Sequence, residues 1–109
     1  RGVVYAGMGN LQAAVKDLDQ AIKTKPDYAD AYYNRGKART ALQDAKGAIA
    51  DFTQAIQLNP NLAEAYGNRG LLYTETGNKQ AALADLQKAA DLFKQQKDED
   101  SYRQTLTYI

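Results

Sequence analysis

The sequence predicts an all-α fold, a right-handed helical-hairpin solenoid with about three repeats and a C-terminal capping helix. The first observation is a period of 34 residues, at which one residue type recurs three times in five sets of positions. These sets are Arg1, Arg35 and Arg69; Gly2, Gly36 and Gly70; Ala14, Ala48 and Ala82; Asp17, Asp51 and Asp85; and Ala21, Ala55 and Ala89. The second observation is that each unit contains two stretches with helical apolar spacing, which is typical of stacked helical hairpins.

The first unit, residues 1–28, is expected to be truncated, because it begins in the second half of a first helix. Gly9-Asn10 predicts a turn, since this residue pair is typical of turns. Residues 11–24 then carry apolar side chains at spacings of three and four, which predicts a helix packed on one side. Pro26 ends this helix, because proline lacks the amide hydrogen that a helix interior requires.

The second unit, residues 29–62, is complete. Its first helix is expected over residues 27–42 and its second over residues 45–58. Gly36 on one helix and Ala48 on the other leave little bulk where the helices cross, so the two backbones can approach closely. Either small residue should therefore resist replacement by a large one.

The third unit, residues 63–96, repeats this pattern with a turn at Gly77-Asn78. Its second helix is expected to continue to about residue 96, because Lys94 stands where the preceding unit has proline. Acidic residues then begin a last helix over residues 98–109, where they favour its positive end. That helix is expected to cap the final repeat, so residues 1–109 form one domain of seven helices.

The repeat units resemble tetratricopeptide repeats. The signature of that family combines, in order, an aromatic residue, Gly, Ala, a second aromatic residue, Ala and Pro. The matching residues are Tyr32, Gly36, Ala48, Phe52, Ala55 and Pro60. Two residues depart from the family pattern, since Arg35 replaces the usual Leu and Arg39 replaces the usual Tyr. The resemblance extends from residue 1 to about residue 96, and it implies a protein that binds other proteins.

Composition argues against several classes of function. The 14 basic and 13 acidic residues are scattered, so no patch for nucleic acid or anionic lipid is expected. The chain has no Cys and no His, and it contains no nucleophile–base pair, phosphate loop or metal-ligand set. We therefore expect no enzyme activity, no cofactor, no metal and no membrane insertion. The repeat style, Asn-Arg-Gly followed by Asp and an aromatic residue, favours a bacterial cytoplasmic protein.

The recurrent aspartates could be read as a carboxylate array, but residues one repeat apart lie about 10 Å apart, too far to share one ion. A structural role fits better, because every unit with this Asp also has an Arg in its first helix. We expect Arg35 and Arg69 each to pair with one of Asp17, Asp51 and Asp85. The sequence leaves open whether the partner lies in the same repeat or the preceding one.

The binding surface is expected on the first helices, which line the inner curve of a hairpin solenoid. Once the core residues are assigned, the remaining face of these helices carries Tyr33, Asn34 and Lys37 in one unit and Asn68, Leu71 and Glu75 in the next. We expect these residues to form one groove for a peptide or a partner helix. The alternative is a structural role, in which the ends of the solenoid stack into homo-oligomers.

A narrower function comes from the resemblance alone. Some tetratricopeptide repeat proteins hold the carboxylate end of a chaperone tail with Lys, Asn and Arg side chains. Asn34 and Asn68 match the Asn of that set, but Val3, Glu64 and Gly67 stand where positive charge is needed. The sequence therefore disfavours this carboxylate clamp.

Overall fold

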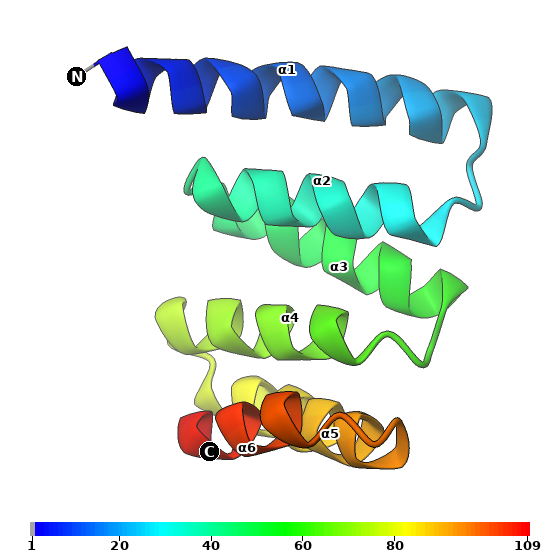
Figure 1. Cartoon of the computed structure of the whole chain (residues 1–109), viewed down its shortest axis with the longest axis vertical. Helices are drawn as coiled ribbons and strands as arrows, with labels where there is room; N and C mark the ends of the chain where they lie inside the picture. Colours follow the sequence, from blue (N-terminus) through cyan, green and yellow to red (C-terminus); the bar gives the residue numbers. More distant parts are fainter. Residues whose placement is uncertain (1) are drawn as a thin grey trace. The chain divides into compact units, whose positions relative to one another are not determined.

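The computed structural model describes the backbone of residues 2–109 and the side chains of residues 10–109, and within this range it contains six α-helices and no β-strand. The helices are α1 (Gly2–Thr24), α2 (Ala29–Ala41), α3 (Ala45–Leu58), α4 (Ala63–Glu75), α5 (Lys79–Gln95) and α6 (Glu99–Tyr108). They form two compact units, Arg1–Leu58 and Asn59–Ile109 (Figure 1). The all-α fold of helical hairpins predicted from the sequence is confirmed.

The first unit contains α1, α2 and α3, with α2 packed against both neighbours. Gln43 joins α2 to α3 and has a φ of 64°, a left-handed conformation that closes the turn. The Asp44 carboxylate then accepts a hydrogen bond from the Gly47 amide at 3.1 Å, which satisfies one of the free amides at the start of α3. The reversal between α2 and α3 is therefore fixed by local hydrogen bonds as well as by packing.

Close packing of α2 on α3 depends on Gly36. A Cβ atom at this position would lie 2.9 Å from Cε1 of Phe52, whose side chain is fully buried. The Phe52 ring thus occupies the space that a side chain on α2 would need. Ala48 and Ala55, which flank Phe52 on α3, are also fully buried, so the small residues of the repeat lie at the helix crossing as expected.

The predicted turn at Gly9-Asn10 is wrong, because α1 is one uninterrupted helix from Gly2 to Thr24 (Figure 1). This difference reduces the expected seven helices to six. A turn inside a helix breaks several backbone hydrogen bonds. The lost free energy is recovered only when the helical segments on either side of the turn bury apolar surface against each other. The arm before Gly9 comprises only residues 2–8, about two helical turns. Continuing the helix keeps the hydrogen bonds that such a short arm could not replace by packing.

The second unit contains α4, α5 and α6, with α5 packed against both neighbours. Gly77 adopts a φ of 86° between α4 and α5, a conformation that glycine reaches without steric cost. Asn78 then caps α5 by accepting a hydrogen bond from the Ala81 amide, and Asp98 caps α6 by accepting one from the Ser101 amide. The two turns predicted at the ends of α5 are therefore present.

A buried cluster of Ala63, Ala89, Leu92 and Phe93 forms the core between α4 and the C-terminal half of α5. Tyr66 of α4 and Tyr102 of α6 pack against this cluster. Helix α6 thereby covers apolar surface at the end of α5, where the sequence no longer follows the repeat.

Two glycines on α4 provide a matched test of helix packing. A Cβ at Gly70 would lie 2.9 Å from Cγ of Leu86 and 3.1 Å from the Ala82 carbonyl oxygen, whereas a Cβ at Gly67 would meet only Ala89, at 3.7 Å. We expect Gly70→Ala to lower the free energy of unfolding by about 1–3 kcal/mol through overpacking. Gly67→Ala should instead raise it by up to about 1 kcal/mol, because alanine favours the helix. Urea denaturation of both variants measures this difference, and equal effects of the two substitutions would contradict the packing described here.

Candidate functional site

The outward face of α2 carries three of the residues expected to bind a partner. Asn34 and Lys37 are exposed, and Tyr33 is half-buried. The Tyr33 ring lies against Phe52, with 5.7 Å between ring centroids and an interplanar angle of 55°. The Lys37 ammonium nitrogen lies 5.3 Å from the centroid of the Tyr33 ring. One side of this aromatic ring thus packs on the core, and a positive charge lies beside it.

The other three expected residues lie on α4. Asn68, Leu71 and Glu75 are separated by three and four positions, so they share one face of the helix. Asn68 and Leu71 are half-buried and Glu75 is exposed. Asn68 occupies the position equivalent to Asn34, 34 residues earlier. The α2 face and the α4 face each carry an amide side chain close to an aromatic or aliphatic one. That these two faces form a single groove stays a prediction.

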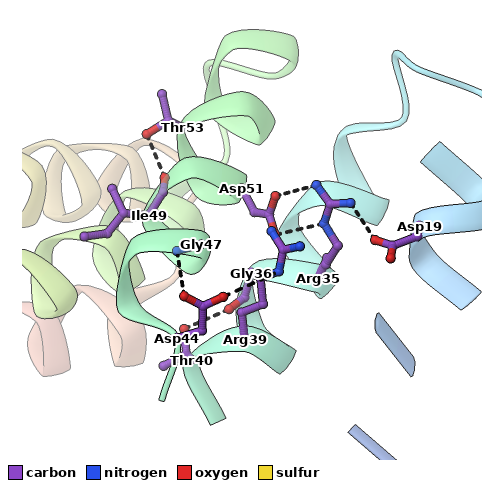
Figure 2. Close-up of polar contacts among 10 residues, drawn as sticks. All are labelled: Asp19, Arg35, Gly36, Arg39, Thr40, Asp44, Gly47, Ile49, Asp51 and Thr53. Carbon is purple, nitrogen blue, oxygen red and sulfur yellow. Dashed lines mark hydrogen bonds and ion pairs between the residues drawn. The ribbon is translucent and has the colours of Figure 1, made fainter. Parts of the chain in front are cut away.

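Behind the α2 face lies an ion-pair network centred on Arg35 and Asp51 (Figure 2). Arg35 donates two hydrogen bonds to the Asp51 carboxylate, from Nε at 2.9 Å and from Nη2 at 2.7 Å. Its third donor, Nη1, reaches Asp19 of α1 at 2.7 Å. Arg35 therefore pairs with the aspartate of its own repeat and also connects α2 to α1.

A second guanidinium reaches the same carboxylate, because Arg39 Nη1 donates to Asp51 Oδ2 at 3.0 Å. The Asp51 side chain is only 3% exposed, while Arg35 and Arg39 are 16% and 27% exposed. Three hydrogen bonds from two cations thus compensate for the burial of one carboxylate. Arg39 occupies the position at which the third repeat has Tyr73, so this departure from the family pattern has a structural role.

The second unit repeats the pair with one arginine. Arg69 donates to both oxygens of Asp85, from Nε at 2.7 Å and from Nη2 at 2.8 Å. The guanidinium carbon of Arg69 lies 5.7 Å from the ring centroids of both Tyr66 and Tyr73. Tyr73 thus takes the place next to the bidentate pair that Arg39 takes in the preceding repeat.

The sequence comparison agrees with this arrangement of repeats. A family model described as TPR repeat matches residues 2–43 and 36–77, and one described as tetratricopeptide repeat matches residues 63–96. The chain belongs to the tetratricopeptide repeat (TPR) family. Among curated protein sequences, none is significantly similar to this one.

Several solved structures resemble this TPR chain. A crystal structure of MamA protein is 30% identical, with a TM-score of 0.72 over 81% of this chain and 48% of that one. A second MamA structure is 22% identical, with a TM-score of 0.72 over 97% of this chain and 70% of that one. The type III secretion translocator chaperone SycD of Yersinia enterocolitica is 13% identical, with a TM-score of 0.86 over 92% of this chain and 70% of that one. The chain thus spans about half the length of the first MamA structure, and SycD shows the fold alone. The TPR repeats support a protein-interaction module in general.

Arg35 and Arg69 remain charged over the whole ordinary pH range. Hydrogen bonding to Asp51 raises the pKa of Arg35, and hydrogen bonding to Asp85 raises the pKa of Arg69, while burial acts in the opposite direction. Because the folded-state pKa of each arginine lies above its unfolded value, the stabilisation from these pairs is complete at any pH below the unfolded pKa. It is lost only as the pH rises through the higher folded-state value.

Asp17 is the member of the aspartate set that the structure does not place with Arg35 or Arg69. It is exposed on α1, where it lines an open hollow of about 450 Å³ with Gln20, Ala21, Thr24, Lys25 and Tyr28. Its equivalent arginine, Arg1, lies outside the described residues.

Sequence reasoning missed Asp19, because its equivalents are Thr53 and Gln87 and no repeat signal marks it. Arg39 could have been found from its place four residues after Arg35, on the same helix face.

In the range 10–109, no three or more acidic side chains gather in a way that could hold a metal ion. Over the described helices, none is both long and apolar enough to cross a membrane.

Proposed function

We propose that this TPR protein is a non-enzymatic module that binds an extended peptide or a helix of a partner protein through the first helices of its repeats. The contact residues are Tyr33, Asn34 and Lys37 on α2, and Asn68, Leu71 and Glu75 on α4. We also propose that these helices belong to one domain with repeat units 1–28, 29–62 and 63–96 and a cap over 98–109. The repeat style supports a bacterial cytoplasmic location.

This function rests on one observation, the packing of the half-buried Tyr33 ring on Phe52. The ring is held against Phe52, so little side-chain freedom is lost when a partner contacts the remaining ring surface. Asn34 and Lys37 are exposed beside it and can bind the backbone and an acidic side chain of a peptide. An ordered aromatic ring with adjacent polar groups is a typical binding hot spot.

The α4 face supports the same function with different chemistry. Leu71 offers apolar contact area, Asn68 repeats the amide of Asn34, and Glu75 is exposed at the C-terminal end of the helix. Lys37 on α2 and Glu75 on α4 are both exposed and carry opposite charges. A partner segment with apolar side chains and both signs of charge fits these two faces.

The experiment is affinity capture with the wild-type protein as bait, followed by mass spectrometry and affinity measurements with the captured partner. Lys37→Glu and Leu71→Ala should each weaken that affinity about tenfold, as expected for central interface residues. Lys46→Glu is the matched control, because Lys46 is exposed on α3 and lies outside both faces. Circular dichroism verifies that each variant is folded. Unchanged affinity in both test variants would show that the partner binds elsewhere.

A further inference from the structure

A surface hollow of about 350 Å³ lies at the turn between α5 and α6. The side chains that line it are Lys94, Lys97, Glu99, Tyr102 and Arg103. Three of them are cationic, one is anionic and one is aromatic, so positive charge predominates in the lining. None belongs to the binding faces of α2 and α4. The hollow is therefore a separate candidate site, beyond the function proposed above.

The positive charges of this hollow are largely not neutralised by the protein. Among the described residues, neither Lys94 nor Lys97 takes part in an ion pair. Arg103 lies 3.6 Å from Glu99, and these two side chains are 74% and 79% exposed. Such an exposed pair contributes little, so a ligand can displace it at small cost. The Asp98 carboxylate at the same turn is already engaged in capping α6.

The backbone around the hollow is held in place by the fold. At the turn, the Asp98 amide donates a hydrogen bond to the Phe93 carbonyl oxygen at 2.9 Å. Gln96 Nε2 donates to the Asn61 carbonyl oxygen, also at 2.9 Å, which connects the turn to the segment before α4. The Tyr102 ring is half-buried and packs against the core cluster of this unit. The ring and the turn are therefore ordered before a ligand binds, which lowers the entropy cost of binding.

The chemistry of the lining indicates the class of ligand. Lysine and arginine side chains donate strong, charge-assisted hydrogen bonds to carboxylates. The Lys94 ammonium nitrogen lies 6.0 Å from the centroid of the Tyr102 ring, so an acidic group and an apolar group can bind side by side. A peptide segment with an apolar residue between acidic residues provides this combination. A nucleic acid fits less well, because the whole chain has a net charge of only +1.

We propose that the hollow at the α5–α6 turn binds an acidic segment of a partner protein. Lys94, Lys97 and Arg103 bind carboxylates of that segment. The exposed part of the Tyr102 ring contacts an apolar side chain between them. Glu99 opposes binding, because its carboxylate competes with the ligand for Arg103. This inference does not depend on the binding faces of α2 and α4.

The proposal is tested with a defined probe, the peptide Ac-Glu-Leu-Glu-Glu-amide, and with Ac-Gln-Leu-Gln-Gln-amide as its uncharged control. Each peptide is titrated into the full chain labelled with nitrogen-15, and the amide resonances are followed by NMR. The acidic peptide should shift resonances of residues 93–104 in a saturable manner, which gives its Kd. The uncharged peptide should not shift them. Added salt should weaken the binding, because the charges of the site are exposed.

Three variants separate binding from folding. Lys94→Glu should raise the Kd about tenfold, because attraction is replaced by repulsion. Lys97→Gly should raise the Kd about threefold through loss of one charge. It should not lower the urea midpoint of unfolding, because glycine reaches the φ of 61° at this position without steric cost. Glu99→Gln should lower the Kd about threefold, since it removes the competing carboxylate.

Lys88→Glu is the matched control, because Lys88 is exposed on α5 and does not line the hollow. It should leave the Kd unchanged, and circular dichroism verifies that each variant is folded. Equal weakening by Lys94→Glu and Lys88→Glu would overturn the proposal, since it would indicate attraction to the overall charge of the protein. Equal binding of the two peptides, or no saturable shift at millimolar peptide, would overturn it as well.

Discussion

Asp51→Ala is expected to lower the free energy of unfolding by about 3–5 kcal/mol, because it leaves two partly buried guanidinium groups without their shared carboxylate. Asp51 is 3% exposed and accepts three hydrogen bonds from Arg35 and Arg39. The pKa of Arg35 is raised by hydrogen bonding, so deprotonation of this group at ordinary pH cannot avoid the cost. Chemical denaturation followed by circular dichroism measures the loss.

Asp19→Ala is the control for this prediction. Asp19 binds the same Arg35 at the same 2.7 Å, but its side chain is 50% exposed. An exposed ion pair contributes little, so this substitution should cost less than about 1 kcal/mol. If Asp19→Ala and Asp51→Ala destabilise the protein equally, then burial does not determine the strength of these pairs.

The repeat predicted most of the fold because each repeated residue has a physical reason to recur. In the two complete repeats, Gly36 and Gly70 lie where helices cross, the repeated alanines beside them are buried, and the repeated Arg and Asp residues form ion pairs. The hairpin α2–α3 and the hairpin α4–α5 therefore followed from sequence. The sequence could not decide whether an arginine pairs with the aspartate of its own repeat or of the preceding one, because either pairing brings opposite charges together. The structure was needed to show that the pairs form within a repeat.

Features that occur once could not be predicted from the repeat. Asp19 and Arg39 have no equivalents of the same type, although both join the network around Arg35 and Asp51. The position equivalent to Tyr33 is Gly67, so the repeat carries no sign that Tyr33 packs on Phe52. The straight α1 is a related case, because Gly9-Asn10 has the sequence of a turn but lacks two long arms to hold it closed.

Phe52→Ala should also lower the free energy of unfolding by about 3–5 kcal/mol, since Phe52 is fully buried and its removal leaves a cavity. The ring fills the space above Gly36 and supports Tyr33. Urea denaturation measures the loss. Phe52→Leu is a milder substitution, because the third repeat has Leu86 at the equivalent position. This variant keeps the measurement possible if Phe52→Ala does not fold.

The contact between Phe52 and Gly36 can be isolated by a double-mutant cycle. In the wild type, Gly36→Ala places a methyl group 2.9 Å from the ring, so overpacking should lower the free energy of unfolding by about 1–3 kcal/mol. In the Phe52→Ala background the ring is gone, and the same substitution should raise it by up to about 1 kcal/mol through helix propensity. The sign of the Gly36→Ala effect therefore reverses between the two backgrounds. An equal cost in both would mean that Gly36 is required for a reason other than the approach of the Phe52 ring.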